Sequence, residues 1–391
     1  MSSVKSELLD YGLVLPDYKN SNLSEIKRFS LGKRIHESNK KLLIIIDGLG
    51  LDMLRRILNK SNSLTKAMEV SEIKEVTTLS PSVTPTLLTS FDSGLDVAKH
   101  GVIGDTMPVK ELGMILKLSA NAPAAVSGSK LDDSSLSFIF PEPNLINKIA
   151  ENNKMIILKP EKLKDSSYCK SMYKNKIEMS YTNIKDLFVK TVMIMKKNQY
   201  DFIYIYMDEV DELLHACSPD SKEAERFVYT LLSAISKHLF AVARKAGYSI
   251  LITSDHGLIT IKAKDIISIE NSDNIMKFMT MPPWGSHRYQ FMDVVDGIDE
   301  LFERAFNVKY RKNAILLRSD DAIMTGLFGS RTVEKGVRYR FGKYIAIALG
   351  NHFFYYLYPH KKKWWLDAKW HHAGVHGGML PKEMYVPAII I

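Results

Sequence analysis

Aspartate and histidine side chains with the chemistry of metal ligands recur at two short spacings in this chain. Asp211 and His215, in the segment DEVDELLHACSP, stand four residues apart, so they share one face if that segment is helical. Asp255 and His256 are adjacent in ILITSDHGLI and precede Gly257, which makes a turn easy and lets both side chains reach one ion. Carboxylate oxygen and imidazole nitrogen are a normal ligand pair for divalent ions. The two pairs indicate a metal site, with an exposed acidic helix and a surface histidine as the alternative for the first pair.

Two further residues offer the same chemistry in glycine-rich surroundings. Asp47 lies in IIIDGLG, where an apolar run meets a turn, and His376 lies in GVHGGM, where glycines let other backbone approach closely. Taken alone, Asp47 fits an ordinary turn and His376 fits a structural or exposed histidine. Each becomes a candidate ligand only if the fold brings it to the other aspartates and histidines.

The candidate nucleophile is Thr84, in the segment LSPSVTPTLLTSF. Pro85 follows it, and proline is favoured at the first position of a helix, so we predict that Thr84 is a helix N-cap. Its hydroxyl would then lie at the positive end of the helix dipole. There it either caps the helix or, with a metal ion beside it, attacks a phosphoryl group.

Three apolar segments predict the strands that position these residues. They read KKLLIIID, DFIYIYMD and YSILITSD, and each ends at an aspartate: Asp47, Asp208 or Asp255. Strands that are apolar on both faces belong to covered parallel sheets, and helical patterns at 145–152 and 221–246 alternate with them. We therefore predict an α/β fold with a mostly parallel sheet. Ligands bind beyond the carboxyl ends of such strands, where the acidic residues fall.

A different pattern follows Gly257. Strand-like pieces (YQFMDVV, NAILL and KYIAIAL) and a helical stretch at 297–306 predict an inserted α+β subdomain at residues 262–363. The segment HHAGVHGGMLPKEMYVPAIII then returns to a loop and an apolar strand. We expect residues 1–261 and 364–391 to form one catalytic core.

Composition sets broad limits on the kind of protein. The chain has 391 residues, 46% of them hydrophobic and 25% charged, as in an ordinary globular protein. The opening MSSVKSELLDYGLVLPDY lacks the pattern of a secretory signal, and apolar strings such as LLIII are too short to span a membrane. Two cysteines, Cys169 and Cys217, exclude a disulfide framework but leave one bridge open. We expect a cytoplasmic protein with no membrane partner.

The net charge of +9 favours anionic partners or substrates. The basic residues are scattered, with runs at 309–312 and at Lys361, Lys362 and Lys363, before Trp364 and Trp365. Basic and aromatic residues side by side could bind nucleic acid, but a solvated surface turn is the simpler interpretation.

Six motifs occur together in a fixed order: DG, PSxT, HGxxG, DxxxH, SDHG and HGG, from Asp47 to Gly378. This order resembles the alkaline phosphatase superfamily, specifically its type I phosphodiesterase and nucleotide pyrophosphatase branch. The resemblance implies an alkaline phosphatase-like three-layer core with helices on both faces of the sheet and a cap insertion. It also implies that His100 and Gly101, of the HGxxG element, are structural.

The same resemblance implies a two-metal phosphohydrolase. Two divalent ions, most often Zn²⁺ with Mn²⁺ as an option, would act on a small phosphate ester or nucleotide through a phosphothreonine on Thr84. One departure is Leu87, three residues after the nucleophile, where family members often carry a phosphate-binding asparagine. Carried over to this chain, the first ion is held by Asp47, Thr84, Asp255 and His256, and the second by Asp211, His215 and His376.

Two other functions stay open. Phosphoglycerate mutase-like phosphotransferases have similar motifs, but they resemble one another in using serine as the nucleophile, and this chain has Thr84 at that position. A core without catalysis could instead bind anions or nucleic acid. The sequence leaves open the oligomeric state and whether the substrate is a diester, a pyrophosphate, a phosphonate or a monoester.

Overall fold

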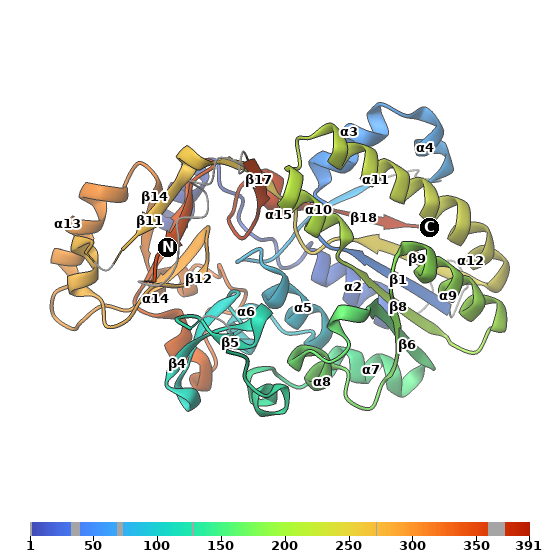
Figure 1. Cartoon of the computed structure of the whole chain (residues 1–391), viewed down its shortest axis with the longest axis horizontal. Coiled ribbons are helices and arrows are strands. Elements are labelled where there is room, and N and C mark those ends of the chain that lie inside the picture. Colours follow the sequence, from blue (N-terminus) through green and yellow to red (C-terminus); the bar gives the residue numbers. More distant parts are fainter. Residues whose placement is uncertain (1, 33–39, 69–72, 127–128, 271, 359–371) are drawn as a thin grey trace.

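The computed structural model describes residues 2–32, 40–68, 73–126, 129–270, 272–358 and 372–391. They form two lobes, each built on a seven-stranded sheet (Figure 1). Among these residues no helix combines the length and the apolar character needed to cross a bilayer. The basic and aromatic run at 361–365 lies outside the described residues.

The sheet of the larger lobe is the predicted parallel one. The three predicted strands are its centre, where β9, β1 and β8 pair in parallel. Only β18 runs against its neighbours. In spatial order the strands are β2 (Lys74–Thr77), β18 (Tyr385–Ile390), β9 (Tyr248–Thr253), β1 (Lys40–Ile46), β8 (Phe202–Met207), β6 (Met155–Pro160) and β7 (Ile177–Tyr181).

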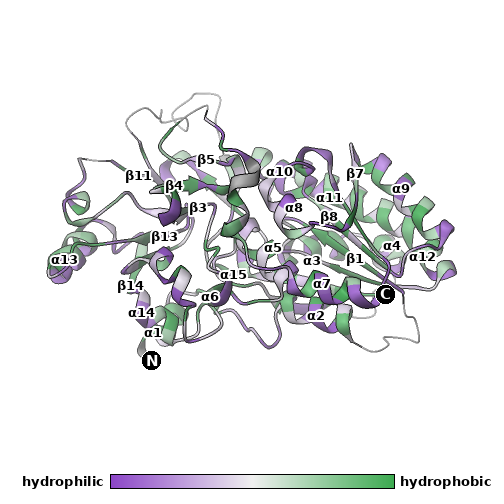
Figure 2. Cartoon of the chain, turned by 90° about the horizontal axis from the view of Figure 1, so that it is seen from below, coloured by the Kyte–Doolittle hydropathy of each residue, from purple (hydrophilic) through white to green (hydrophobic). Residues whose placement is uncertain are grey.

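Helices cover both faces of this sheet, as predicted. Alternate residues of β1 enter different cores: Leu42 and Ile44 face one helical layer, and Leu43 and Ile45 face the other. Figure 2 shows hydrophobic colour along β1 and β8 and mixed colour on the helices around them. The first layer holds α3 (Leu51–Asn59), α4 (Asn62–Ala67), α9 (Ile184–Lys197), α11 (Lys222–Ile235) and α12 (Ala241–Ala246); the second holds α2 (Asn22–Leu31), α5 (Thr84–Ser93), α7 (Asn144–Asn152) and α8 (Ser167–Met172).

The helix expected at 221–246 is not uniform, because a π-helical turn at Ser236–Phe240 joins α11 to α12. Both of its neighbours are helical, and Leu239 and Phe240 of the turn are buried in the same core as the helices. The turn therefore changes the hydrogen-bond pattern without exposing the apolar face.

The second lobe is built on an antiparallel sheet. A helix, α13 (Asp299–Tyr310), packs against it through Phe302 and Phe306, where a helix was expected at 297–306. The spatial order is β14 (Ala314–Arg318), β15 (Tyr344–Ala348), β13 (Tyr289–Met292), β12 (Trp284–Ser286), β3 (Thr106–Val109), β4 (Met114–Lys117) and β5 (Ala122–Pro123).

This second sheet combines strands from the predicted insertion with β3, β4 and β5, which lie far earlier in the chain. The junction is the single pair Gly285 and Thr106 between β12 and β3. Near this junction Gly104 lets the two segments approach closely, since a Cβ on Gly104 would lie 2.5 Å from the carbonyl carbon of Gly285. The boundaries 262 and 363 stay a prediction. A cap limited to residues 262–363 would leave out β3, β4 and β5, which belong to the same sheet.

The remaining elements connect the lobes or cover their edges. Two small two-stranded sheets join β10 to β17 and β11 to β16, and β17 lies between the lobes in Figure 1. These elements are α1 (Ser2–Asp10), α6 (Val97–His100), α10 (Glu209–Cys217), α14 (Ser319–Met324), α15 (Pro381–Met384), β10 (Ile259–Lys262), β11 (Ile266–Ile269), β16 (Phe353–Tyr356) and β17 (His372–Val375), with short 3-10 turns between them.

A fully buried ion pair fastens the second lobe to the core. Arg288, in the turn between β12 and β13, donates from Nε to Glu383 Oε1 at 2.7 Å and from a terminal nitrogen to Oε2 at 3.0 Å. The same carboxylate accepts the backbone N–H groups of Gly378 and Leu380. Glu383 therefore holds both the hairpin and the loop that carries His376.

We predict that Glu383→Ala lowers the free energy of unfolding by about 3–5 kcal/mol, because it leaves the Arg288 guanidinium buried without a partner. Urea unfolding followed by circular dichroism measures this. The matched control is Asp320→Ala, since Asp320 pairs with Arg338 and its side chain is 81% exposed. An equal effect of both substitutions would contradict the role given to the buried pair.

Candidate functional site

The site lies at the carboxyl ends of β9, β1 and β8, which are neighbours in the parallel sheet. Asp47 follows β1, and Asp255 and His256 follow β9. After β8 the chain turns into α10, which carries Asp211 and His215. Gly48 has a φ of 77°, and a Cβ there would lie 3.0 Å from the Cα of Asp211, so glycine lets α10 approach the end of β1.

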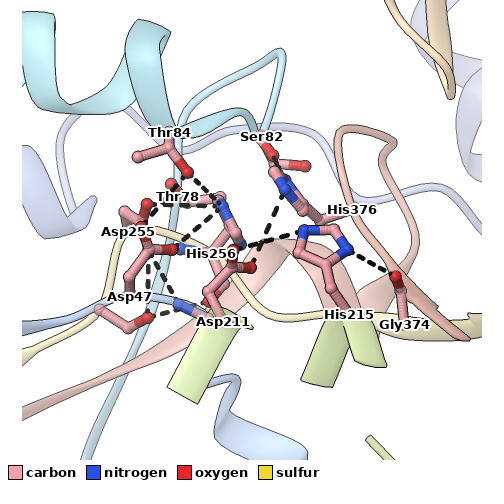
Figure 3. Close-up of polar contacts among 12 residues, drawn as sticks. Asp47, Thr78, Ser82, Thr84, Asp211, His215, Asp255, His256, Gly374 and His376 are labelled. Carbon is pink, nitrogen blue, oxygen red and sulfur yellow. Dashed lines mark hydrogen bonds and ion pairs between the residues drawn. The ribbon is translucent and has the colours of Figure 1, made fainter. Parts of the chain in front are cut away.

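The first ligand group consists of Asp47, Asp255 and His256, and all three are buried. The Nε2 atom of His256 lies 3.5 Å from Oδ1 of Asp47 and 3.4 Å from Oδ2 of Asp255. Figure 3 shows the two carboxylates and the imidazole facing one another. Two strands far apart in sequence thus place two carboxylates and one imidazole around a single point.

The second group consists of Asp211, His215 and His376. Asp211 and His215 lie four residues apart on α10, and His215 Nε2 is 3.3 Å from Asp211 Oδ2. His376 follows β17 and places its Nε2 4.0 Å from the other oxygen, Oδ1, of Asp211. The exposed fraction of the His215 side chain is 42%, against 15% for Asp211, so this group faces solvent more than the first one does.

The two groups adjoin through their histidines. The rings of His256 and His376 stack with centroids 3.6 Å apart and planes 14° apart, and the His215 ring lies 5.2 Å from that of His376. The structure therefore brings together all the residues predicted to bind metal or to attack, in the same two sets as predicted. Their roles as ligands stay a prediction.

Thr84 is the first residue of α5 and points into the first group (Figure 3). Its Oγ1 lies 3.1 Å from Nε2 of His256 and 3.4 Å from Oδ2 of Asp47. The prediction that Thr84 is the N-cap was wrong by one residue, because the cap is Val83, in extended backbone. The Thr84 hydroxyl contacts the site, and no side chain caps the helix.

Hydrogen bonds that the sequence did not reveal orient the first group. The Tyr206 hydroxyl donates to Oδ2 of Asp47. The Asn22 amide donates to the carbonyl oxygens of Ser254, at 2.9 Å, and Asp255, at 3.2 Å, and so fixes the end of β9. The available signal was a tyrosine near the carboxyl end of the buried strand FIYIYM, since a buried phenol needs a partner.

Backbone carbonyls orient the histidines of the second group. Nδ1 of His215 lies 2.7 Å from the Gly374 oxygen, and Nδ1 of His376 lies 2.9 Å from the Ser82 oxygen. A carbonyl only accepts, so each Nδ1 carries a proton, and Nε2 is the ring nitrogen that faces Asp211 in both histidines. Histidines that bind metals commonly donate their other N–H in this way.

Burial and like charge disfavour ionised carboxylates in the first group. Burial raises the pKa of Asp47 well above its usual range, and the charges of Asp255 and Asp211 raise it further. Burial also raises the pKa of Asp255 to about 7, with Asp211 adding to the shift. His256 cannot supply the missing positive charge, because burial and His376 hold its pKa well below the usual value. A bound cation would favour the ionised carboxylates.

The second group is electrostatically different. Burial opposes ionisation of Asp211, but the charge and the hydrogen bond of the neighbouring His215 outweigh it and lower the pKa of Asp211. Burial likewise lowers the pKa of His215, but the Asp211 carboxylate and its hydrogen bond overcome this and raise the pKa. Burial lowers the pKa of His376. Asp211 is therefore ionised at neutral pH.

The donor atoms fit divalent ions. Each carboxylate keeps one buried oxygen without a hydrogen-bond partner: Oδ1 of Asp47, Oδ1 of Asp211 and Oδ2 of Asp255. Each of these oxygens lies between 3.4 and 4.0 Å from a histidine Nε2. Two ligands bound at about 2.0–2.1 Å in tetrahedral geometry stand roughly 3.4 Å apart. The unpartnered oxygens and this spacing are those expected of atoms that share an ion.

A cavity of about 910 Å³ opens beside the two groups. Thr84, His215 and His376 form its inner end, and residues of the second lobe, including His287 and Phe353, form another wall. A volume of this size is typical of sites for small organic ligands. Residues of both lobes therefore line one cavity, and Thr84 is among them.

Other residues of the predicted motifs lie outside the ligand groups. Nδ1 of buried His100 accepts the Val102 N–H at 3.0 Å, which leaves Nε2 to donate to Ser90 at 2.7 Å. Burial lowers the pKa of His100 to about 3, consistent with a neutral structural residue. Leu87 is buried in the main core and does not line the cavity, so it cannot contact phosphate there. Asp208 pairs with Lys162 at 2.9 Å. Both cysteines are free.

Residues 41–286, more than half of the chain, match the model of the family described as type I phosphodiesterase / nucleotide pyrophosphatase. The chain belongs to this family. It is a branch of the alkaline phosphatase superfamily, so the predicted resemblance is confirmed, and the protein is a phosphoric ester hydrolase of a metal-dependent class. No curated protein sequence matches the chain.

Solved structures share the fold at low sequence identity. Human ectonucleotide pyrophosphatase / phosphodiesterase 5 is 17% identical with a TM-score of 0.63, and the alignment covers 90% of this chain and 87% of that one. The murine protein is 14% identical with a TM-score of 0.62, covering 89% and 87%. Phosphonoacetate hydrolase from Sinorhizobium meliloti 1021 is 16% identical with a TM-score of 0.62, covering 92% and 91%. These similarities confirm the alkaline phosphatase-like fold.

We predict that Asp255→Asn has opposite effects with and without metal. Folding raises the Asp255 pKa from 3.8 to about 7, so the folded state binds the extra proton between those values and stability falls as pH rises through them. In chelator at pH 8, the variant should be more stable by roughly 2–4 kcal/mol, and this gain should shrink toward pH 4.

With Zn²⁺ or Mn²⁺ added, the variant should show a smaller rise in Tm than wild type, because it binds the ion more weakly. Calorimetry with and without metal at several pH values provides both measurements. Equal destabilisation by the substitution in both conditions would show that Asp255 has a purely structural role.

Proposed function

We propose that this protein hydrolyses phosphate diesters or nucleotide pyrophosphates with Thr84 as nucleophile and two divalent ions, most often Zn²⁺, bound by the two ligand groups. The observation that carries the proposal is the position of the Thr84 hydroxyl. It lies at the start of α5 and within 3.4 Å of two atoms of the first group, Oδ2 of Asp47 and Nε2 of His256.

Asp47, Asp255 and His256, with the Thr84 oxygen, would hold one ion, and Asp211, His215 and His376 would hold the other. Ions bound there lower the pKa of a hydroxyl and neutralise negative charge on phosphoryl oxygens. The alternative is a core that binds anions without catalysis. It does not explain why the Thr84 hydroxyl faces the site without capping its helix, or why three buried carboxylate oxygens of the site lack hydrogen-bond partners.

The residues of the chain prepare the attack in three ways. The Thr84 hydroxyl lies 3.4 Å from Oδ2 of Asp47, the oxygen that is not assigned to the ion and that can accept the proton. Tyr206 holds Asp47 in place. The first turn of α5 has free backbone N–H groups, and its positive end favours the phosphoryl group.

In the first step the Thr84 oxygen forms a bond to phosphorus while the bond to the leaving oxygen breaks on the opposite side. In the second step water attacks the phosphorus of this threonine ester, which still carries the remaining organic group of the substrate. The bond between phosphorus and the Thr84 oxygen breaks, and the threonine regains its proton. Because the phosphoryl group goes to water, free product should accumulate. A phosphoglycerate mutase-like enzyme would instead return it to an acceptor.

The proposed substrate is small and nucleotide-like. The cavity volume and the aromatic side chains on its wall suit an organic group attached to phosphorus. An inactive threonine-to-alanine variant of the murine structural neighbour has been solved in complex with AMP. That complex supports testing nucleotides first, with phosphonates and monoesters as comparisons.

We predict that Thr84→Ala lowers kcat for bis(p-nitrophenyl) phosphate by roughly 10³-fold or more in the presence of Zn²⁺ or Mn²⁺ while the circular dichroism spectrum stays unchanged. Thr84→Ser is the matched control, because it keeps a hydroxyl at the same place and should retain part of the activity. Mass spectrometry of acid-quenched wild type should detect the p-nitrophenyl phosphate ester of Thr84. Wild-type rates from the alanine variant would exclude the mechanism.

A further inference from the structure

One histidine of the cavity wall belongs to neither ligand group. His287 lies in the turn between β12 and β13, lines the cavity and is exposed to its interior. Both of its neighbours in sequence are fixed to the segment that follows His376. Ser286 donates to the Gly377 oxygen at 3.3 Å, and Arg288 pairs with Glu383. The hairpin therefore holds His287 at a fixed position relative to the site.

One backbone hydrogen bond positions His287, and one ring hydrogen bond and two stacked rings set the orientation of its imidazole. The His287 oxygen accepts the Phe354 N–H at 2.8 Å, and Nδ1 lies 3.0 Å from the Phe354 oxygen. The ring stacks on Phe353 at 4.3 Å and on Tyr355 at 5.3 Å between centroids. Because a carbonyl only accepts, Nδ1 carries the proton and Nε2 has the lone pair.

Two acceptors on this wall have no partner among the described residues. One is Nε2 of His287. The other is Oε1 of Gln290, a residue with 6% exposure whose own Nε2 is used in donating to the Ser286 oxygen at 2.6 Å. Desolvation by the surrounding protein lowers the pKa of His287, so the imidazole is neutral at physiological pH. A neutral imidazole and an amide oxygen would satisfy a hydrogen-bond donor and would leave an anion without a partner.

We propose that His287 determines specificity by accepting a hydrogen bond, through Nε2, from an N–H or O–H on the organic part of the substrate. This inference rests on the proposed function and narrows its substrate class. Substrates should carry a neutral donor group on the organic moiety that enters the cavity. His287 is not required for attack on phosphorus, because it contacts neither Thr84 nor either ligand group.

The test compares two diesters with the same leaving group. Thymidine 5′-monophosphate p-nitrophenyl ester carries N–H and O–H donors, and methyl p-nitrophenyl phosphate carries none. His287→Phe keeps an aromatic ring to stack on Phe353 but loses the acceptor. We expect kcat/KM for the thymidine ester to fall about tenfold, as for one lost hydrogen bond in a buried site, and that for the methyl ester to change less than twofold.

A binding measurement accompanies the kinetics. Thymidine 5′-monophosphate should bind the variant about tenfold more weakly than wild type, with the affinity for inorganic phosphate unchanged. His238→Phe is the matched control, because His238 also stacks on a phenylalanine, Phe188, and is exposed, but lies on the helix layer away from the cavity. It should change none of these quantities.

Each other result has a definite meaning. Equal losses on both esters, or no loss on the thymidine ester and no weaker binding of the nucleotide, would overturn the role of His287. Wild type that hydrolyses neither ester would overturn the proposed function itself, and the nucleotide binding comparison would still decide whether His287 contacts the organic group.

Discussion

Three aspartates at buried strand and helix ends can be ionised together only if positive charge binds between them. Among the described residues, the ion pairs of these aspartates are with histidines and not with Lys or Arg, and the histidine between Asp47 and Asp255 stays neutral. Hydrogen bonds satisfy one oxygen of each of these two carboxylates, and their other oxygens remain buried without a partner. The local architecture, from the turn at Gly48 to the phenol of Tyr206, is therefore the one expected of a site that binds cations.

The parallel sheet satisfies this constraint because it carries three strand ends to one edge. The second lobe completes the site from the other side, and the buried pair of Arg288 and Glu383 keeps the two in register. The result is a division of labour within one cavity. Under the proposed function, the core would supply the groups that act on phosphorus, and aromatic rings and His287 of the second lobe would contact the rest of the substrate.

The sequence predicted the parts of the protein that depend on local pattern. Continuous apolar runs marked β1, β8 and β9, and the ligand candidates other than Thr84 and His376 stood at or just beyond the ends of those runs. Contacts between distant segments were not predictable in this way. The strands β3, β4 and β5 are only two to four residues long, and β3 joins its sheet through one pair with Gly285. Tyr206 resembled a core residue, since the partner of its hydroxyl comes from another strand.

The position of the last strand has a consequence for how the chain matures. β18 fills the gap between β2 and β9, although about 130 residues separate it from the nearer of the two. When β9 has left the ribosome, the edges of β2 and β9 that β18 will cover are therefore still unpaired. His376 and Glu383 also belong to this late segment, so the second ligand group, the buried ion pair with Arg288 and the closure of the sheet are all completed by the same part of the chain.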